Sequence, residues 1–384
     1  FGQWVFHPGY DTVGNIGGRP YLNISLFASV SHALGRSRQE LLETLEGTLY
    51  MHLPEGIEIP IFPIAKGSLP AILLALVRTR IQEWRGTKGL LAYLASNPAR
   101  CSRLRQRIQE AASKDELLAL WQEQIHPHVT SSVWHVMGSV SSSTSHTMRL
   151  RRTLEERVGP DDAHVLISNL SDSSGVSGSS GLSNESRLLA SLGPVVGIAR
   201  LARGQMERAA YLEQYGHRGP HEFELSLPRP VEDPDWLDRE LARFRESPVE
   251  IEAQLARQRA EFEAAWARFQ TRYPRQANPM RRRIDEAARR ARLRESARSE
   301  YVRDRWLVRA FALRAGELTA LGDDVFFLTL DEMIDLLSGE ETAVASIPAQ
   351  KETYEKHRAL PPYPSIIVGC FDPFQWAASP NRRT

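Results

Sequence analysis

The stretch LRESARSEYVRDRWLVRAFALRAGELTALGDDVFFLTL, residues Leu293–Leu330, decides the fold of this chain. It begins as a long charged segment in which apolar residues recur every three or four positions, among them Tyr301, Trp306 and Phe311. That spacing is typical of one buried face of an α-helix. A Gly-Asp-Asp turn is predicted to end the helix, and the apolar run Val325–Leu328 after it is predicted to be a short strand. The stretch contains no nucleophile motif, metal cage or phosphate loop, so it indicates a scaffold.

Most of the remaining chain is also predicted to be helical. Ser37, Ser113 and Thr329 are each followed three residues later by a glutamate, the signature of a capping box at a helix start. Residues 235–272 and 279–321 are long and rich in helix formers, and the short connection between them favours an antiparallel pair. The expected fold is therefore mainly α, a multi-helical domain with long antiparallel helices and a few short strand-like or irregular segments.

Composition divides the chain into four predicted segments. A Ser/Gly-rich passage has almost no bulky side chains, so it cannot bury a core and is expected to be a flexible loop. It contains no lysine, which excludes a Walker-type phosphate loop. The predicted segments are an N-terminal helical subdomain with a candidate apolar pocket (1–165, its first 23 residues irregular), the Ser/Gly loop (166–186), a long-helix subdomain (187–345) and a Pro-rich exit linker (346–384).

Composition also bounds the class of protein. The chain has 384 residues, 42% of them hydrophobic, which suffices for a sizeable core. A net charge of +1 gives no general attraction to nucleic acid, and the basic residues between Arg281 and Arg309 alternate with acids, so no nucleic-acid partner is expected. The apolar run Leu69–Val77 is too short to span a membrane, and no membrane partner is expected. Two cysteines, Cys101 and Cys370, suggest no disulfide framework, so a cytoplasmic location is the expectation. The chain does not begin with methionine, and we expect it to be part of a longer protein.

One motif carries candidate chemistry. The segment Tyr215–Pro220 reads Y-G-H-R-G-P, and Glu222 follows it. An arginine such as Arg218 offers a fork for phosphate oxygens, and a histidine such as His217 is a proton carrier near neutral pH. The alternative interpretation is a tight glycine turn in which Arg218 only bonds helix-end carbonyls.

A second candidate lies on the long helix. Arg294 and Arg298 are four residues apart and share one helical face, with Glu295 beside the first. They could bind an anionic group or dock another domain. A surface ladder of ion pairs is the alternative.

Aromatic and methionine residues before position 158 form the candidate apolar pocket. Trp134 and Met137 lie in a helical region and suit a large, partly apolar ligand, although the same residue types also build plain cores. The histidines of this region have no metal-binding spacing, and no metal site is expected. These histidines are His126, His128, His135 and His146.

Taken together, these motifs resemble the central domain of the phosphoenolpyruvate-utilising dikinase superfamily, most closely the rifampicin phosphotransferases, and also phosphoenolpyruvate synthase. The similarity covers L-R-E-x-x-R from Leu293, V-F-F-L-T from Val325 and the Y-G-H-R-G-P turn. The segment N-I-G-G-R-P-Y from Asn15 looks like the opening of that domain. The prolines after Leu360 look like its linker to a mobile histidine domain. The matches follow the family's order along most of the chain.

This resemblance implies an acceptor-substrate-binding domain. In the family an ATP-grasp domain passes the β-phosphate of ATP to a histidine on a swivelling domain, which delivers it to the acceptor. ATP and Mg are thus expected for the parent protein and no cofactor in this chain. The expected partners are a large, partly apolar small molecule and the ATP-grasp and histidine domains. No catalytic residue is assigned; the substrate-binding candidates are Tyr215, His217, Arg218, Glu222, Trp134, Met137, Arg294 and Arg298.

Neither an ATP-grasp region nor an S-H-x-A-I-type histidine motif occurs in the sequence, so the chain alone is expected to be catalytically silent. Two other interpretations stay open. The chain could be a non-catalytic helical module that binds a protein. It could instead be the acceptor domain of a ligase-like pathway enzyme that works through an acyl phosphate.

Overall fold

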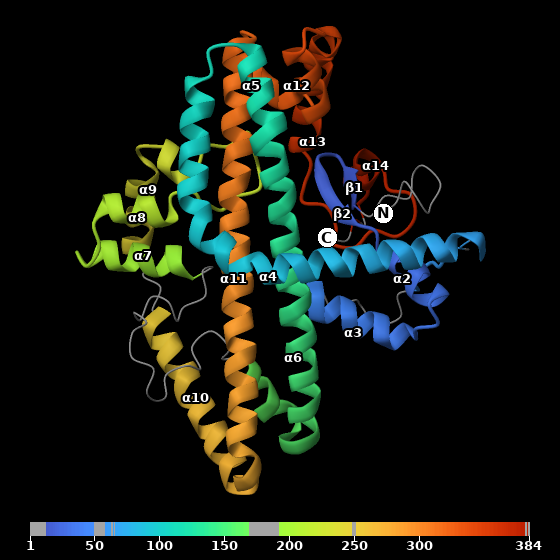
Figure 1. The fold of residues 1–384 in the computed structure, drawn as a ribbon, viewed down its shortest axis with the longest axis vertical. Coiled ribbons are helices and arrows are strands. Elements are labelled where there is room, and N and C mark those ends of the chain that lie inside the picture. Colours follow the sequence, from blue (N-terminus) through green and yellow to red (C-terminus); the bar gives the residue numbers. More distant parts are fainter. Residues whose placement is uncertain are drawn as a thin grey trace. The chain divides into compact units, whose positions relative to one another are not determined.

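The chain is mainly α-helical, as predicted, and Figure 1 shows the ribbon of a computed structural model. The structure describes residues 13–49, 58–62, 64, 66–168, 192–247, 251–380 and 382. The predicted Ser/Gly loop lies outside these residues except for its first three positions. Two compact units are formed, one from Phe1–Arg80 with Ala315–Thr384 and the other from Ile81–Arg314. Helices α4 (Leu69–Glu110) and α11 (Pro274–Leu318) each contain residues of both units. The predicted segment limits at 165 and 187 stay a prediction.

The unit 81–314 consists of helices. Besides most of α4 and α11 it contains α5 (Lys114–Leu120), a π-helical turn (Trp121–Ile125), α6 (His126–Ser168), α7 (Gly193–Ala202), α8 (Arg208–Tyr215), the 3-10 helix η5 (Pro230–Glu232), α9 (Trp236–Glu246) and α10 (Ile251–Arg272). In Figure 1 the long helices α6 and α11 run side by side, and α7, α8 and α9 form a cluster of short helices.

The main core of this unit lies between α6, α10 and α11. Leu150 of α6, Phe269 of α10 and Ile284 of α11 are all fully buried there. The single helix predicted over 235–272 is wrong, because α9 and α10 are separate helices. Pro274 is the first residue of α11, a position where the missing N–H of proline costs no helical bond. The chain reverses there, and α10 and α11 diverge from this junction in Figure 1.

Helices α4 and α6 cross at two glycines. A Cβ atom on Gly86 would overlap the carbonyl group of Trp134, and one on Gly138 would overlap the carbonyl of Glu83. Only glycine therefore allows the two backbones to approach this closely. Helix α6 continues beyond this crossing to Ser168 through a bend at Gly159, where φ is 82°.

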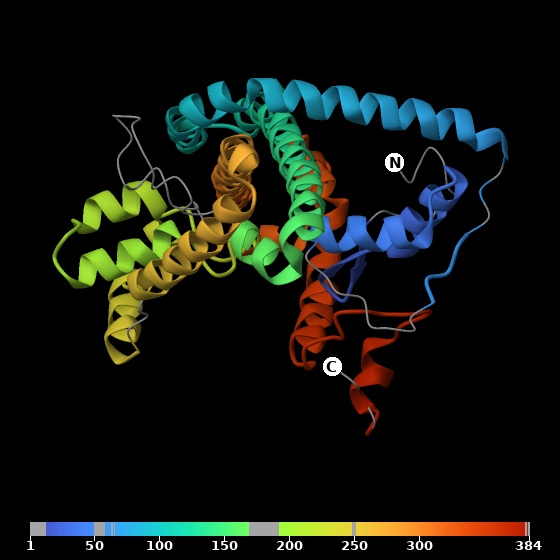
Figure 2. The same cartoon turned by 90° about the horizontal axis from the view of Figure 1, so that it is seen from below.

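The other unit contains a β-hairpin where irregular structure was predicted. Strands β1 (Val13–Ile16) and β2 (Arg19–Leu22) are antiparallel. The two glycines between them have φ values of 55° and 81°, as a two-residue hairpin turn requires. The hairpin lies against the C-terminal segment (Figure 2), where the Arg19 guanidinium lies 3.7 Å from the ring centre of Tyr363. The Tyr21 hydroxyl donates to the Pro364 carbonyl at 2.8 Å.

The remaining elements of this unit correct two further predictions. The run predicted as a strand at Val325–Leu328 is mostly 3-10 helix η6, and the exit linker 346–384 includes two helices instead of being extended throughout. The capping box at Thr329 and Glu332 is confirmed, with bonds of 2.7 and 3.3 Å. The elements are α2 (Ile24–Ala33), α3 (Arg38–Leu49), η1 (Lys66–Ser68), η6 (Gly322–Phe327), α12 (Leu330–Leu337), η7 (Thr342–Ser346), α13 (Ile347–Arg358) and α14 (Pro373–Ala378). Across the described part of the chain, each helix falls short of the combined length and apolarity that a membrane span needs.

Candidate functional site

The Y-G-H-R-G-P turn begins at the end of α8, and the packing of α7 against α8 positions it. Gly193 and Gly197 lie one helical turn apart on α7, and Cβ atoms there would overlap the rings of Tyr215 and Tyr211. The two glycines thus let the tyrosine rings lie flat against the helix. Burial raises the pKa of the Tyr211 hydroxyl. The end of α8, and with it the turn, is held in place by this contact.

Backbone hydrogen bonds then fix the turn itself. The Gly216 N–H donates to Leu212 at 2.8 Å, and the Arg218 N–H donates to Tyr215 at 2.7 Å. The Val231 N–H donates back to the Gly216 carbonyl at 3.1 Å, which ties the turn to η5. The side chains of His217 and Arg218 therefore project from a backbone that these hydrogen bonds hold in place.

His217 points inward toward α11. It is 2% exposed, and its Nε2 lies 3.1 Å from the hydroxyl of Ser299. Burial lowers the pKa of this imidazole well below its usual range, and the nearby cations Arg303 and Arg218 lower it further. His217 is therefore a neutral imidazole at pH 7. No group among the described residues bonds its Nδ1.

Arg218 and Glu222 form a buried ion pair. The Arg218 Nε donates to one oxygen of Glu222 at 2.6 Å, and Arg298 of α11 donates to the other at 3.2 Å. Both Arg218 and Glu222 are less than 10% exposed, whereas the Arg298 side chain is half exposed. The prediction that Arg218 bonds helix-end carbonyls is replaced by this carboxylate bridge. Charge-assisted bonds of this kind hold both arginines in fixed directions.

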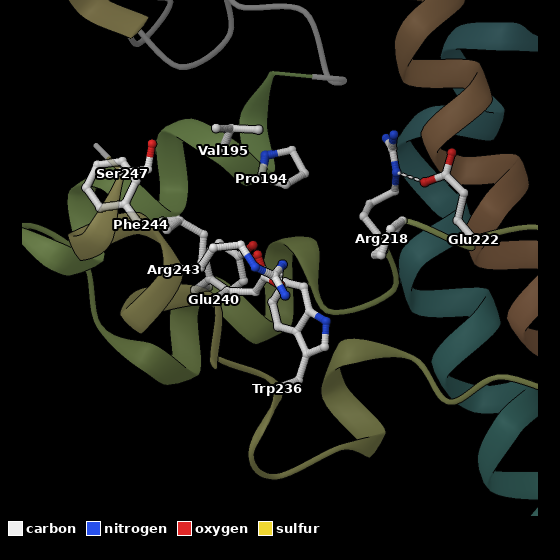
Figure 3. Close-up of a pocket in the computed structure, with 13 residues that line it drawn as sticks. Pro194, Val195, Arg218, Glu222, Trp236, Glu240, Arg243, Phe244 and Ser247 are labelled. Atoms are coloured by element: carbon white, nitrogen blue, oxygen red, sulfur yellow. Dashed lines mark hydrogen bonds and ion pairs between the residues drawn. The ribbon is translucent and has the colours of Figure 1, made fainter. Parts of the chain in front are cut away.

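Two cavities flank the turn. The first has a volume of about 490 Å³ and lies between the turn and helices α7 and α9. Figure 3 shows the Arg218–Glu222 pair across this cavity from Pro194 and Trp236. Apolar side chains form most of its walls, and Glu240 and Arg243 add charged groups to the lining. Its shape and lining suit a partly apolar small molecule.

The second cavity is larger and more polar. It has a volume of about 760 Å³ and is lined by Tyr215 and His217 from the turn. Three arginines contribute to it, and Arg303 is also paired with Glu300 at 3.1 Å. The arginines in its lining are Arg200, Arg292 and Arg303. The lining also contains Glu213 and Glu300, so the three arginines exceed the acidic side chains by one, and the excess positive charge suits an anionic group.

The structure brings together five of the eight predicted binding residues. Tyr215, His217, Arg218 and Glu222 line the two cavities, and Arg298 reaches them through Glu222. Their role in binding stays a prediction.

The other three predicted residues lie elsewhere. Arg294 is paired with its neighbour Glu295 at 3.0 Å. Trp134 lies at the α4–α6 crossing, and Met137 is 43% exposed. None of the three lines either cavity.

Sequence reasoning missed the residues that complete the cavities. Ser299 and Arg303 come from α11, and Trp236 comes from α9. No local spacing connects them with the turn, since they lie up to 88 positions away from Tyr215 along the chain. The turn region is joined to α11 by Glu232 of η5, whose carboxylate accepts a hydrogen bond from the Trp306 indole at 2.7 Å.

A second polar cluster, also missed, is buried between α4, α6 and α11. Asp304 is fully buried and bonds the Tyr93 hydroxyl at 2.6 Å, His128 at 3.1 Å and Cys101 at 3.2 Å. Burial alone would raise the pKa of this carboxyl, but the bonds from His128, Tyr93 and Cys101 outweigh burial and lower it. Burial, together with the charge of Asp304, raises the pKa of the Cys101 thiol. This is the one cluster in the described part of the chain where Cys, His and acidic side chains come close enough to share a metal ion.

Fold and site together define a mainly α-helical domain with a rigid polar turn between two cavities. No known protein-family profile matches the chain. The prodigiosin-synthesizing transferase PigC of Serratia marcescens is 27% identical to it over 182 residues, which cover 44% of this chain and 20% of PigC. The match therefore spans about a fifth of the length of this relative. Over this stretch the chain is similar to a transferase.

Proposed function

We propose that this chain is the acceptor-substrate-binding part of a multidomain, ATP-dependent phosphotransferase of the dikinase type, in which a histidine of another domain carries the phosphate. The observation that carries the proposal is the position of the Tyr215–Pro220 turn. It stands between an apolar and a cationic cavity and presents buried, fixed side chains to both. The similarity of part of the chain to a transferase supports it.

The apolar cavity is the proposed seat of the acceptor. Ile198 and Phe244 supply apolar contact, and Trp236 adds an aromatic wall. Arg218 faces the cavity while held by Glu222, so it can orient a hydroxyl or carboxyl group without first losing side-chain entropy. A large, partly apolar acceptor with a few polar groups fits these walls.

The cationic cavity is the proposed approach for the phosphoryl group. Its arginines would neutralise the charge of a phosphoryl group that arrives on the histidine domain. The neutral His217 adds no further positive charge and positions Ser299 on the cavity wall. ATP and Mg would be bound by the parent protein outside this chain. Both cavities are open to solvent on one side, so the docked histidine domain would have to cover that side to exclude water from its phosphohistidine.

The name of the relative favours one variant of this proposal. PigC is named for a synthesis, not for the phosphorylation of an antibiotic. The parent protein would then activate a carboxyl group as an acyl phosphate and join it to a second molecule. The acceptor cavity is the same in both variants, so an acceptor screen should include carboxylated as well as hydroxylated compounds.

A binding experiment with a blocked cavity tests the proposal. Purified chain is screened by thermal shift against rifamycins and other large hydroxylated or carboxylated compounds, and hits are titrated by calorimetry. Val195→Arg places a long side chain into the apolar cavity from a residue that is 40% exposed, so it removes little core packing. Leu91→Arg is the matched control, because Leu91 is 64% exposed and lines neither cavity.

We expect Val195→Arg to weaken binding at least tenfold, about 1.4 kcal/mol, and Leu91→Arg to bind like the unaltered chain. Equal affinity in both variants would place the ligand outside this cavity and contradict the proposal. Absence of any binding compound would favour the protein-interaction alternative.

A further inference from the structure

Four ligand atoms converge inside the unit 81–314, in a buried cluster that borders the second cavity through Glu300. Asn97 and Cys101 are one turn apart on α4, His128 is on α6 and Asp304 is on α11. The Asn97 Oδ1 lies 2.9 Å from the His128 Nε2 and 3.4 Å from the Cys101 Sγ. The Asp304 Oδ1 lies 3.1 and 3.2 Å from the same two atoms. All four residues are less than 10% exposed.

These distances are close to the edges of a tetrahedral zinc site. With zinc bonds of about 2.3 Å to sulfur and about 2.0 Å to nitrogen and oxygen, neighbouring ligand atoms lie roughly 3.3–3.5 Å apart. The four separations given above, which correspond to four of the six edges, are shorter by a few tenths of an ångström. The ligand atoms of Cys101, His128 and Asp304 all lie within 4.8 Å of one another, so side-chain shifts would admit an ion. Sulfur, imidazole nitrogen and carboxylate oxygen are the ligand types that zinc prefers.

Outer contacts already orient the ligands. The Tyr93 hydroxyl bonds the second oxygen of Asp304, which leaves Oδ1 facing the cluster. The Asn97 amide nitrogen donates to Glu300 at 3.0 Å, which turns its oxygen toward the same point. Such second-shell bonds are characteristic of built metal sites.

Proton counting points the same way. In the metal-free cluster the Cys101 thiol and the His128 Nε2 each have at most one proton, yet each faces both Asn97 and Asp304. Two protons cannot support four hydrogen bonds at full strength. A cation at the centre would satisfy all four acceptor atoms, and its two positive charges would balance the Asp304 carboxylate and a Cys101 thiolate.

We propose that Asn97, Cys101, His128 and Asp304 bind one divalent transition-metal ion with the ligand preference of Zn²⁺. All four positions are filled by protein atoms and the site is closed to solvent, so the ion has a structural role that joins α4, α6 and α11. Binding converts the Cys101 thiol to a metal-bound thiolate and releases its proton to solvent. Affinity therefore rises with pH.

Cobalt substitution is the direct test, with the complete chain and Co²⁺ alone as the probe. We expect about one Co²⁺ per chain, with the intense visible absorption of a tetrahedral site and a near-ultraviolet thiolate-to-cobalt band. Zn²⁺ should displace the signal and raise the thermal midpoint. Cys101→Ser should lose the thiolate band, and Cys370→Ser should keep it, because Cys370 is an exposed thiol outside the cluster.

Circular dichroism shows whether Cys101→Ser is folded. If it is not folded, the cobalt spectra of the unaltered chain and of Cys370→Ser decide whether the cluster binds the metal. Loss of the band in Cys370→Ser, or its absence in the unaltered chain after metal removal and Co²⁺ addition, would overturn the proposal. The same holds if Zn²⁺ leaves the thermal midpoint unchanged. The site does not rest on the acceptor proposal, since ligand binding in the apolar cavity is measured separately.

Discussion

At the scale of single residues, His217 gives the chain a pH-dependent stability. Its folded pKa lies well below the ordinary value of about 6.5, because burial and neighbouring arginines disfavour the charged form. Below pH 6.5 the unfolded chain therefore binds a proton that the folded chain does not, and the free energy of unfolding falls. We expect His217 to account for a loss of about 1 kcal/mol between pH 7 and pH 5.5.

Urea unfolding of His217→Gln at both pH values checks this contribution. The variant should lose that part of the pH dependence, whatever its stability at pH 7. His164→Gln is the control, because His164 is an exposed histidine of the same unit, and its pH dependence should match that of the unaltered chain. An unchanged slope in His217→Gln would contradict the neutral, buried state of this imidazole.

The residues of the site were only partly predictable from sequence. The local order Tyr215–Pro220 was sufficient to select the turn, because glycine and proline so close together commonly mark a turn. Its partner Ser299 could not be found, because contact between the turn and α11 depends on the packing of several helices. The same reason hides the Cys101–His128–Asp304 cluster, whose members lie on three helices and show no ligand spacing along the chain.

At the scale of helices and strands, the crossing of α4 and α6 depends on Gly86. An alanine there would place its Cβ on the Trp134 backbone, which cannot move without shifting the whole helix. We expect Gly86→Ala to destabilise the chain by about 1–3 kcal/mol, the usual range for overpacking. Chemical denaturation measures the change. Gly67→Ala is the matched control, since a Cβ at Gly67 meets nothing within 4 Å; it should leave stability unchanged or raise it slightly.

Local rules predicted helix starts well and short extended segments poorly. The box at Thr329 works through side chains within four residues, so the start of the helix that follows it was predicted correctly. The β1–β2 hairpin was missed because its strands have four residues each and draw support from the distant residues Tyr363 and Pro364. The run at Val325–Leu328 has the composition of a strand, but it pairs with neither β1 nor β2 and is mostly 3-10 helix.

At the scale of the whole molecule, helical periodicity sufficed for the fold class but not for the two units. Periodicity along Leu293–Leu330 reports one helix and its buried face. It contains no information about α11 leaving one compact unit for the other near residue 314. Grouping of segments 1–80 and 315–384 depends on contacts between residues more than 200 positions apart, such as Arg19 with Pro361.

The last prediction concerns ATP. The sequence contains neither an ATP-grasp region nor an S-H-x-A-I-type catalytic-histidine motif, so neither the ATP site nor the phosphate-carrying histidine of a dikinase is identified in it. We therefore expect the purified chain, supplied with ATP, Mg²⁺ and a compound that binds it, to form no AMP and no phosphorylated product above the protein-free background. Chromatography of the nucleotides measures AMP directly, and an AMP-forming dikinase added to the same mixture serves as the positive control. If the AMP-forming activity co-purified with the chain, was lost in Val195→Arg and was kept in Leu91→Arg, the chain itself would perform the transfer. The proposed role as an acceptor domain would then be wrong.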